Sequence, residues 1–549
     1  MEGPHPASMA GPQTASTPTG PAAEGARGRR GDVIVGAAVV VASLAWFLWR
    51  ISRPFPWEDE GATFIVMSRS WPQFLTVWHG ADAPLFPYYL LTRLWLGLLH
   101  LILGTPLSMG PIRSLSAVAA ALAVGCVYAV SARWRGRWAG LLAALVFAFF
   151  PGVSRYAQEA RPYALLMFGT TLSWLAWDVW RARARDAAAR GGWARGIGYS
   201  VVLAGTSLVH LFGLFQWPAQ LVSTWLVEGG AGQDRRARWR MSLRAAMLMV
   251  LALLLAAYPV AVAASRGKGG WGPLPVTIPT VLRELVTVVF YTTHVPAWAL
   301  AVLVVLGLAG LSDLLPVGGS PAASERRAFA LVVVIWFAIP FVLGVLAGLA
   351  IKPALMQTRY WMPLAPPLAI LTAMGLLRLA ELATAALRRG RPAARGGVVP
   401  IVSFVLAVVV LAPLMWSDNL STRGPGGHGR NPTGVLKVVQ QTRATYPGTP
   451  VCILPYTIDA SFAPVTPDFV AQNPLLRLHS GSATVWPVAQ SRAAVATSLQ
   501  HAPRVLVIFG GHSAHTDPAP SVLVSLGYRT VWRKSSWSGY SVLLLQKSS

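Results

Sequence analysis

The chain has 549 residues, of which 54% are hydrophobic and 12% are charged. Because a soluble domain usually carries about 25% charged residues, this composition excludes an ordinary soluble enzyme. The net charge of +26 does not indicate a nucleic acid partner. The arginines lie mostly in short connections between apolar runs, where they report membrane orientation. We predict a polytopic α-helical membrane protein.

Residues 1–30 are rich in Gly, Pro, Ala, Ser and Thr and end in a group of arginines, and the first apolar run follows at about 33–50. We expect a disordered cytoplasmic tail and an uncleaved first helix rather than a removable signal peptide. Residues 51–85 then form the first external loop, in which 61–78 predicts amphipathic helices that lie on the membrane.

Many further apolar runs approach the roughly 20 residues that cross a bilayer. They lie at about 111–131, 137–151, 162–180, 197–211, 213–228, 242–264, 297–315, 328–350, 362–384 and 398–416. The positive-inside rule places five arginine-rich connections in the cytoplasm. These are Arg133–Arg137, Arg181–Arg195, Arg235–Arg244, Arg326–Arg327 and Arg388–Arg395. Residues 152–161, 265–296, 351–361 and everything after 416 are then external.

Residues 86–104 are apolar enough to cross the membrane, but a full crossing would reverse the side of Arg133–Arg137. Arg93 and His100 within this segment favour an interfacial or partly inserted helix. Both alternatives stay open, and the expected total of about eleven to thirteen membrane helices depends on the choice.

After residue 416 the composition becomes polar. Residues 417–432 predict a linker, and 433–549 alternate between helical and strand-like patterns. Helices are expected near 433–445, 488–501 and 519–527, and strands near 451–454, 504–509, 528–533 and 541–546. The sequence thus predicts a membrane domain over 31–416, followed by a small external α/β domain.

Asp59 and Glu60 lie side by side just after the first helix, in a loop that also carries Trp57, His79 and Asp82. Solvated loop acids are the simplest interpretation of this pair. However, apolar and aromatic residues surround it, and a carboxylate held against an apolar surface loses solvation. Its pKa then rises toward the range of a general base. We therefore predict a catalytic pair.

Two more charged clusters lie at external helix ends. Glu159 and Arg161 precede Tyr163, and Lys352 and Arg359 lie in another external loop with Tyr360 next to them. A helix-end ion pair and ordinary headgroup contacts would explain them without a site. Cations outside nevertheless run against the positive-inside bias, so we expect them to bind an anion such as a lipid phosphate.

Three blocks of the sequence resemble the C-type (GT-C) glycosyltransferase superfamily. The likeness is strongest to the branch of protein O-mannosyltransferases and aminoarabinose transferases, particularly its actinobacterial members. The blocks are Asp59–Thr63, Tyr156–Leu165 and Lys352–Tyr360, and together they span most of residues 30–380. No block is specific alone, but their order, side and spacing form a set. The C-terminal domain carries no familiar motif.

The resemblance implies an inverting enzyme that moves a sugar from a polyprenyl-phosphate carrier to an acceptor hydroxyl. It implies Asp59 as general base, with Glu60 tuning Asp59 or positioning the acceptor. The other implied contacts are Asp82, His79, Glu159, Tyr163 and Trp57 for acceptor or sugar, and Arg161, Lys352, Arg359 and Tyr360 for the donor phosphate. Some relatives hold a divalent metal, for which Asp59, Glu60 and Asp82 are candidate ligands without a firm prediction. Glu159 stands where the branch often has an aspartate, so no second catalytic aspartate is carried over.

Two other functions fit the same composition: a lipid-linked sugar flippase, and an inactive scaffold that binds the cell wall. A transporter should carry ionisable residues in the middle of its spans, and the central spans here are almost free of them. We expect a multi-pass plasma membrane protein with a cytoplasmic N-terminus and an extracytoplasmic C-terminal domain. Mannose and arabinofuranose are the expected sugars, and a glycan, glycolipid or protein of the envelope is the expected acceptor.

Overall fold

The structure of the protein is a computed structural model, and it describes most residues between 21 and 548. The described part omits residues 81, 185–191, most of 229–275, 292–294, 316–319, 351–352, 388–397, 429–432, 455–496, 498, 500, 511–520 and 538–539. Lys352 and the expected helix at 488–501 therefore lie wholly or largely outside the described residues.

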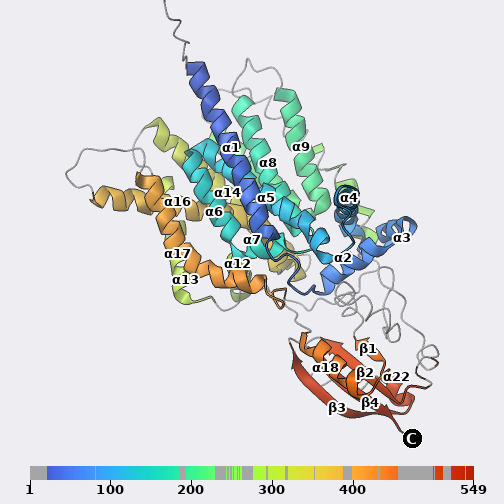
Figure 1. The fold of residues 1–549 in the computed structure, drawn as a ribbon. Coiled ribbons are helices and arrows are strands. Elements are labelled where there is room, and N and C mark those ends of the chain that lie inside the picture. Colours follow the sequence, from blue (N-terminus) through green and yellow to red (C-terminus); the bar gives the residue numbers. More distant parts are fainter. Residues whose placement is uncertain are drawn as a thin grey trace, which may run out of the picture.

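A bundle of long helices makes up most of the molecule, and a small sheet domain lies at one end of it (Figure 1). The helix α1 begins at Pro21, inside the stretch predicted to be a tail. The helices of the bundle and its loops are α1 (Pro21–Leu48), α2 (Glu58–Ser68), α3 (Trp71–Leu75), α4 (Phe86–Leu103), α5 (Met109–Arg135), α6 (Arg137–Phe149), α7 (Pro151–Ala157), α8 (Tyr163–Ala184), α9 (Gly192–Val209), α10 (Gln216–Glu228), α12 (Ile278–Phe290), α13 (Ala297–Leu311), α14 (Pro321–Ala350), α15 (Thr358–Trp361), α16 (Ala365–Leu387) and α17 (Val398–Thr422).

Among the described residues, six helices are long and apolar enough to cross a membrane, or up to eight if each of two bent helix pairs forms one span. The polytopic helical class is thereby confirmed, and the part of the chain that the structure describes holds fewer such helices than the expected total for the whole chain. The runs at 197–211 and 213–228 form the shorter helices α9 and α10, and 242–264 falls largely outside the described residues.

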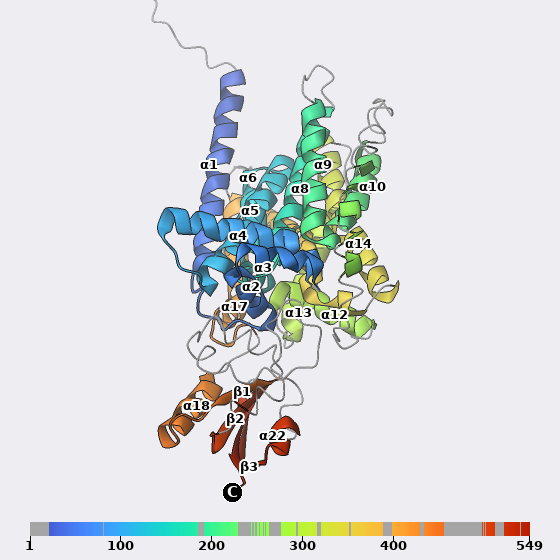
Figure 2. The same cartoon turned by 90° about the vertical axis from the view of Figure 1, so that its right-hand side faces the viewer.

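Helix α5 is central, because it packs against α1, α6 and α8. Its buried face is rich in alanine, including Ala117, Ala120 and Ala123. Small side chains let membrane helices approach closely, which explains why this helix has neighbours on several sides. Helix α4 lies across the direction of α1 and α8 rather than along it (Figure 2), which favours the interfacial alternative for residues 86–104.

A sharp bend after α6 brings α7 to the end of the bundle that carries the sheet domain. The two helices differ in direction by 69° at Phe150, and Pro151 begins α7 at a position where a missing N–H is tolerated. The next residue, Gly152, lies so close to the backbone of α12 that an added Cβ would be 2.0 Å from the carbonyl oxygen of Val288. Glycine therefore permits α7 to pack directly on α12, and the loop at 158–162 follows α7.

The C-terminal domain is a four-stranded sheet with the strand order β1-β2-β4-β3. Its strands are β1 (Val451–Leu454), β2 (Arg504–Gly510), β3 (Tyr528–Trp537) and β4 (Tyr540–Lys547), and its described helices are α18 (Thr433–Thr445) and α22 (Ser521–Ser525). The pairs β2–β4 and β3–β4 are antiparallel, and β1–β2 is parallel. All four expected strands are confirmed.

The chain between bundle and sheet is tied to the first loop. Helix α17 continues to Thr422, so the segment predicted as a linker from 417 begins as helix. The backbone N–H of Phe55 donates to the carbonyl of Pro425 at 2.9 Å. The Phe55 ring packs in the core of the sheet domain with Val435 and Tyr540. The first loop therefore contacts both the linker and the C-terminal domain.

Candidate functional site

The carboxylate of Asp59 lies where three distant segments of the chain meet. It stands in the first turn of α2, and its Oδ2 is 3.0 Å from Nη1 of Arg359 and 3.5 Å from Nη2 of Arg161. Arg161 ends the loop after α7, and Arg359 lies in α15. The Asp59 side chain is 18% exposed and both arginines are 9% exposed. One accessible acid thus lies between two largely buried cations.

A hydrogen-bonded chain extends from Arg161 to a second acid. Nη1 of Arg161 donates to the Tyr89 hydroxyl at 3.3 Å, and that hydroxyl donates to Oδ2 of Asp82 at 3.0 Å. Burial raises the pKa of Asp82, although Arg161 opposes this effect. Asp82 is therefore connected to Asp59 through one tyrosine and one arginine. Tyr89, in α4, is not among the predicted site residues.

Glu159 lies on the other side of the Asp59 cluster and is almost completely buried. Its Oε2 accepts a bond from Arg155 at 2.6 Å, and its Oε1 accepts one from Nε1 of Trp57 at 2.9 Å. Burial raises the pKa of Glu159, Arg155 lowers it, and the nearby Glu60 raises it again, so that the net direction is upward. Because both oxygens have partners, Glu159 holds the Trp57 ring, over which Arg359 lies at 5.4 Å.

Glu60 lies next to Asp59 in sequence but in a different environment, with no exposed surface. Both of its oxygens accept bonds from Arg113 at 2.8 Å. The backbone N–H of Ala160 adds a third bond at 2.9 Å, and Nδ1 of His428 lies 2.7 Å away. Burial raises the pKa of Glu60, but Arg113 and His428 outweigh it and hold the pKa well below its usual range. Glu60 thus connects the first loop to the loop after α7, to α5 and to the linker.

His428 is the least expected member of this cluster, because it lies in the segment predicted as a plain linker. Its side chain is fully buried against Glu60, and its Nδ1 is also 3.1 Å from Nη2 of Arg113. Burial lowers the pKa of His428, Arg155 and Arg113 act in the same direction, and Glu60 opposes them, so that the net pKa is about 3. A neutral imidazole is consistent with the local charge, since Glu60 and Arg113 already balance each other.

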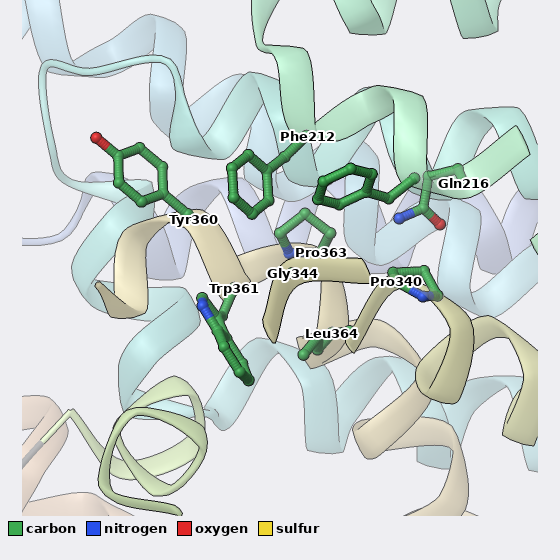
Figure 3. A pocket seen from close by; sticks show the side chains of 9 residues that line it. Phe212, Gln216, Pro340, Gly344, Tyr360, Trp361, Pro363 and Leu364 are labelled. Carbon is green, nitrogen blue, oxygen red and sulfur yellow. The ribbon is translucent and has the colours of Figure 1, made fainter. Parts of the chain in front are cut away.

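Aromatic rings support the short helix that carries Arg359. The Tyr360 ring stacks on Phe212 with centroids 5.3 Å apart, and His210 packs against Tyr360 at 5.4 Å and Tyr163 at 6.0 Å. Figure 3 shows the Phe212 and Tyr360 rings facing each other at one end of a small apolar pocket. The helix start is fixed by Glu284, whose Oε2 accepts the backbone N–H of Thr358 at 2.8 Å.

The remaining predicted site residues are placed as follows. Trp57, Tyr163 and Tyr360 lie at the cluster, whereas His79 is more peripheral and contacts the Tyr258 hydroxyl through its Nδ1 at 2.7 Å. Lys352 lies outside the described residues. His210, directly after α9, packs against the Tyr360 ring, and its Nδ1 accepts the backbone N–H of Phe212.

The residues that sequence reasoning missed are mainly Arg113, Arg155, Glu284 and His428. Arg113 lies at the edge of an apolar run, where a buried cation needs an anion, and this was a usable signal. Arg155 stands four residues before Glu159, a spacing at which side chains can pair, and this was a second signal. Glu284 and His428 gave none, because their partners are distant in sequence. Among the described residues, no group of three or more His, Cys, Asp or Glu could hold a metal. In the structure the candidate ligands Asp59, Glu60 and Asp82 accept hydrogen bonds from arginine or tyrosine side chains.

The fold is similar to that of ArnT from Cupriavidus metallidurans. The apo state of ArnT gives a TM-score of 0.54 at 14% identity, with 94% of this chain and 98% of that chain covered. ArnT bound to undecaprenyl phosphate gives 0.51 at 13% identity over the same shares. The oligosaccharyltransferase AglB from Archaeoglobus fulgidus, in complex with an inhibitory peptide and a dolichol-phosphate, gives 0.51 at 12% identity over 86% of this chain and 69% of that chain.

No sequence family matches the chain, and no characterised protein matches it in sequence. The structural similarities establish that the chain has the fold of the GT-C membrane glycosyltransferases, as the resemblance of its three sequence blocks implies.

Proposed function

We propose that the protein is a membrane glycosyltransferase that takes a sugar from a polyprenyl-phosphate carrier, with Asp59 as its general base. The observation that carries this proposal is the position of the Asp59 carboxylate between Arg359 and Arg161, at 3.0 and 3.5 Å. The proposal is also supported by ArnT and AglB, which share the fold and were solved with undecaprenyl phosphate and a dolichol-phosphate.

The two arginines would bind the donor phosphate. Arginine presents a planar fork that matches phosphate oxygens, and a charge-assisted bond to phosphate is about twice as strong as a neutral one. When the phosphate arrives, it competes with Asp59 for Arg359 and Arg161. The Asp59 oxygen that now faces these cations then becomes available to accept a proton. Donor binding would therefore activate the base.

The reaction itself is a single displacement. Asp59 accepts the proton of the acceptor hydroxyl, and the hydroxyl oxygen forms a bond to the anomeric carbon. The bond from that carbon to the phosphate oxygen breaks, and its electron pair leaves with polyprenyl phosphate. Arg359 and Arg161 stabilise the negative charge that grows on this oxygen. Attack from the face opposite the leaving group inverts the anomeric carbon.

Glu60 and Glu159 have structural roles in this proposal rather than catalytic ones. Both are buried and bonded on both oxygens. Glu60 would hold the first loop so that Asp59 meets the arginines, and Glu159 would hold Trp57. Asp82 and Tyr89 would keep Arg161 in place and offer polar atoms to the sugar or the acceptor. Lys352 stays a proposed phosphate contact.

We place this site on the extracytoplasmic side of the plasma membrane, because the positive-inside rule puts the arginine-rich connections on the other side. Mannose and arabinofuranose are the proposed sugars. The acceptor would be a hydroxyl on an envelope glycan, a glycolipid or a protein. Polyprenyl phosphate and membrane lipids are then obligatory partners.

The test uses the purified full chain in lipid with labelled polyprenyl-phosphate mannose and polyprenyl-phosphate arabinose. Wild type is compared with Asp59→Asn and with Asp313→Asn, which changes an acid paired with Arg135 away from the Asp59 cluster. Release of label by wild type and Asp313→Asn, and its loss in folded Asp59→Asn, would support the proposal and name the sugar. If neither donor is bound or turned over, the transferase proposal fails, and transport of lipid-linked sugar becomes the alternative.

A further inference from the structure

The C-terminal domain carries more positive than negative charge. Residues 433–549 contain nine Lys and Arg but only three acids, Asp459, Asp468 and Asp517, and all three acids lie outside the described residues. The charged side chains of the described part are Lys437, Arg443, Arg504, Arg529, Arg533, Lys534 and Lys547. Cations gathered in this way create a positive potential that concentrates anions.

The register of the sheet arranges part of this charge in a row. Arg504 of β2 and Arg529 of β3 are both directly opposite Gln546 of the central strand β4. Opposite residues share one face of a sheet, and neighbouring strands lie about 4.8 Å apart, so the two arginines flank the Gln546 amide at a spacing of about 10 Å. Lys547 follows Gln546 along β4, so its side chain points to the opposite face of the sheet. We call Arg504, Gln546 and Arg529 the cationic row.

The cationic row is both accessible and partly preordered. Arg529 and Gln546 are exposed, and Arg504 is half-buried. The guanidinium of Arg504 lies 4.1 Å from the centroid of the Tyr446 ring, just after α18. This stacking limits the freedom of the Arg504 side chain, which lowers the entropy lost when it binds a ligand.

The cationic row faces away from the helix bundle. The opposite end of the domain contains Val435 and Tyr540, and these residues pack with Phe55 from the first loop. The C-terminal end of the chain, just after Lys547, lies at the outer tip of the domain (Figures 1 and 2). The headgroups of the membrane that holds the bundle are therefore at the opposite end of the domain and do not reach the cationic row.

We infer that the cationic row binds an anionic polysaccharide beyond the membrane surface. Arg504 and Arg529 would each take a sulfate, phosphate or carboxylate group of the polymer, and the Gln546 amide would bond to a sugar hydroxyl between them. The cations are spread along a row rather than gathered around one point, which fits a chain of repeated charges better than one small anion. The inference goes beyond the proposed transferase activity, apart from the external position that both assume.

The experiment measures binding without any donor sugar, so that its outcome is independent of turnover. The full chain is placed in nanodiscs of phosphatidylcholine, and its affinity for dextran sulfate is compared with that for neutral dextran of equal length. The test variant is Arg504→Gln with Arg529→Gln. The matched control is Arg326→Gln with Arg327→Gln, two exposed cations in α14. Both variants remove two positive charges.

Wild type and the control should bind dextran sulfate equally well and bind neutral dextran far more weakly. The row variant should bind dextran sulfate about thirtyfold more weakly, because each cation beside an anionic surface contributes about fivefold. Equal losses in both variants would show an effect of net charge and overturn the inference. It would also be overturned by unchanged binding of the row variant, by equal binding of neutral dextran, or by binding of poly-glutamate in preference to dextran sulfate, which would indicate an acidic protein partner.

Discussion

Asp59 and Glu60 are adjacent in sequence, yet they belong to two regions with different physical tasks. Asp59 is partly exposed, and two arginines approach it from separate loops. Glu60 is fully buried and is bonded to Arg113, His428 and the Ala160 backbone. The comparison shows that two adjacent acids at the membrane edge can have different roles. One acid stays available for chemistry, and the other fixes the loop that presents it.

The largest effect on stability is expected when Glu60 loses the cation that pairs with it. We expect Arg113→Met to destabilise the protein by about 3–5 kcal/mol, because it strands a buried carboxylate. The double variant Glu60→Gln with Arg113→Met should recover part of this loss, since no buried charge is then unpaired. Thermal unfolding in detergent measures both. A single variant as stable as wild type would refute the structural role of the Glu60 cluster.

The cations around Asp59 should affect turnover rather than stability. Arg359→Lys keeps the charge but loses the planar fork, so we expect turnover of the lipid-linked donor to fall by about 10²-fold with a nearly unchanged unfolding temperature. The matched control is Arg378→Lys, in a surface ion pair with Glu381. It should change neither quantity. Equal turnover of the two variants would argue against a phosphate contact by Arg359.

The Glu60 cluster should also give the protein a pH dependence through His428. An unfolded histidine takes up a proton near pH 6.5, whereas burial lowers the pKa of His428, and likewise that of His210, to about 3. The unfolded state therefore binds more protons as the pH falls from 6.5 to 4.5, and stability decreases by up to about 1.4 kcal/mol per pH unit for each histidine. The lowered pKa of Glu60 adds its own loss only below 4.5.

Replacing His428 isolates its share of this effect. We expect His428→Gln to reduce the slope of unfolding temperature against pH between 6.5 and 4.5 by about half, because His210 remains. Above pH 6.5 neither histidine contributes a slope. An unchanged slope in the variant would mean that His428 is already protonated at neutral pH, contrary to its place beside Arg113.

The smallest effect is expected at His79, which the sequence suggests as a contact of acceptor or sugar. Its imidazole contacts the hydroxyl of Tyr258, and its contact is exposed. We expect His79→Ala to change stability by at most about 0.5 kcal/mol and turnover by about twofold or less. A loss of turnover comparable to that of Arg359→Lys would extend the site to the helical turn after α3 that ends at His79.

Hydropathy and arginine placement were sufficient to predict the helical membrane class. They also predicted that Asp59, Arg161 and Arg359 lie on the same side of the membrane, where the structure brings their side chains together. Alternation of apolar residues was sufficient for the four strands of the C-terminal sheet. The division between Asp59 and Glu60 could not be predicted, because it depends on Arg113 and His428. These residues lie 53 and 368 positions from Glu60 along the chain. Burial by remote segments decides such a case, and local composition contains no information on it.

Helix orientation was a second limit of the sequence. The length and hydropathy of α4 suit a membrane span, whereas in the structure it lies across the bundle (Figure 2). The direction of a helix is set by its packing partners, here the cluster of Val66, Phe74 and Tyr88 that joins it to the first loop. A hydropathy window does not contain those contacts.

The most direct test of the central claim is a paired measurement on Asp59→Asn and Glu60→Gln, with donor turnover and unfolding temperature recorded for both. Asp59→Asn should lower turnover by about 10²–10⁴-fold, as expected for loss of a general base, and keep a near wild-type unfolding temperature. Glu60→Gln should lower the unfolding temperature strongly, because it leaves Arg113 buried without its counter-charge. If the two variants behave alike, or if Asp59→Asn retains turnover, the division between a catalytic and a structural acid is wrong.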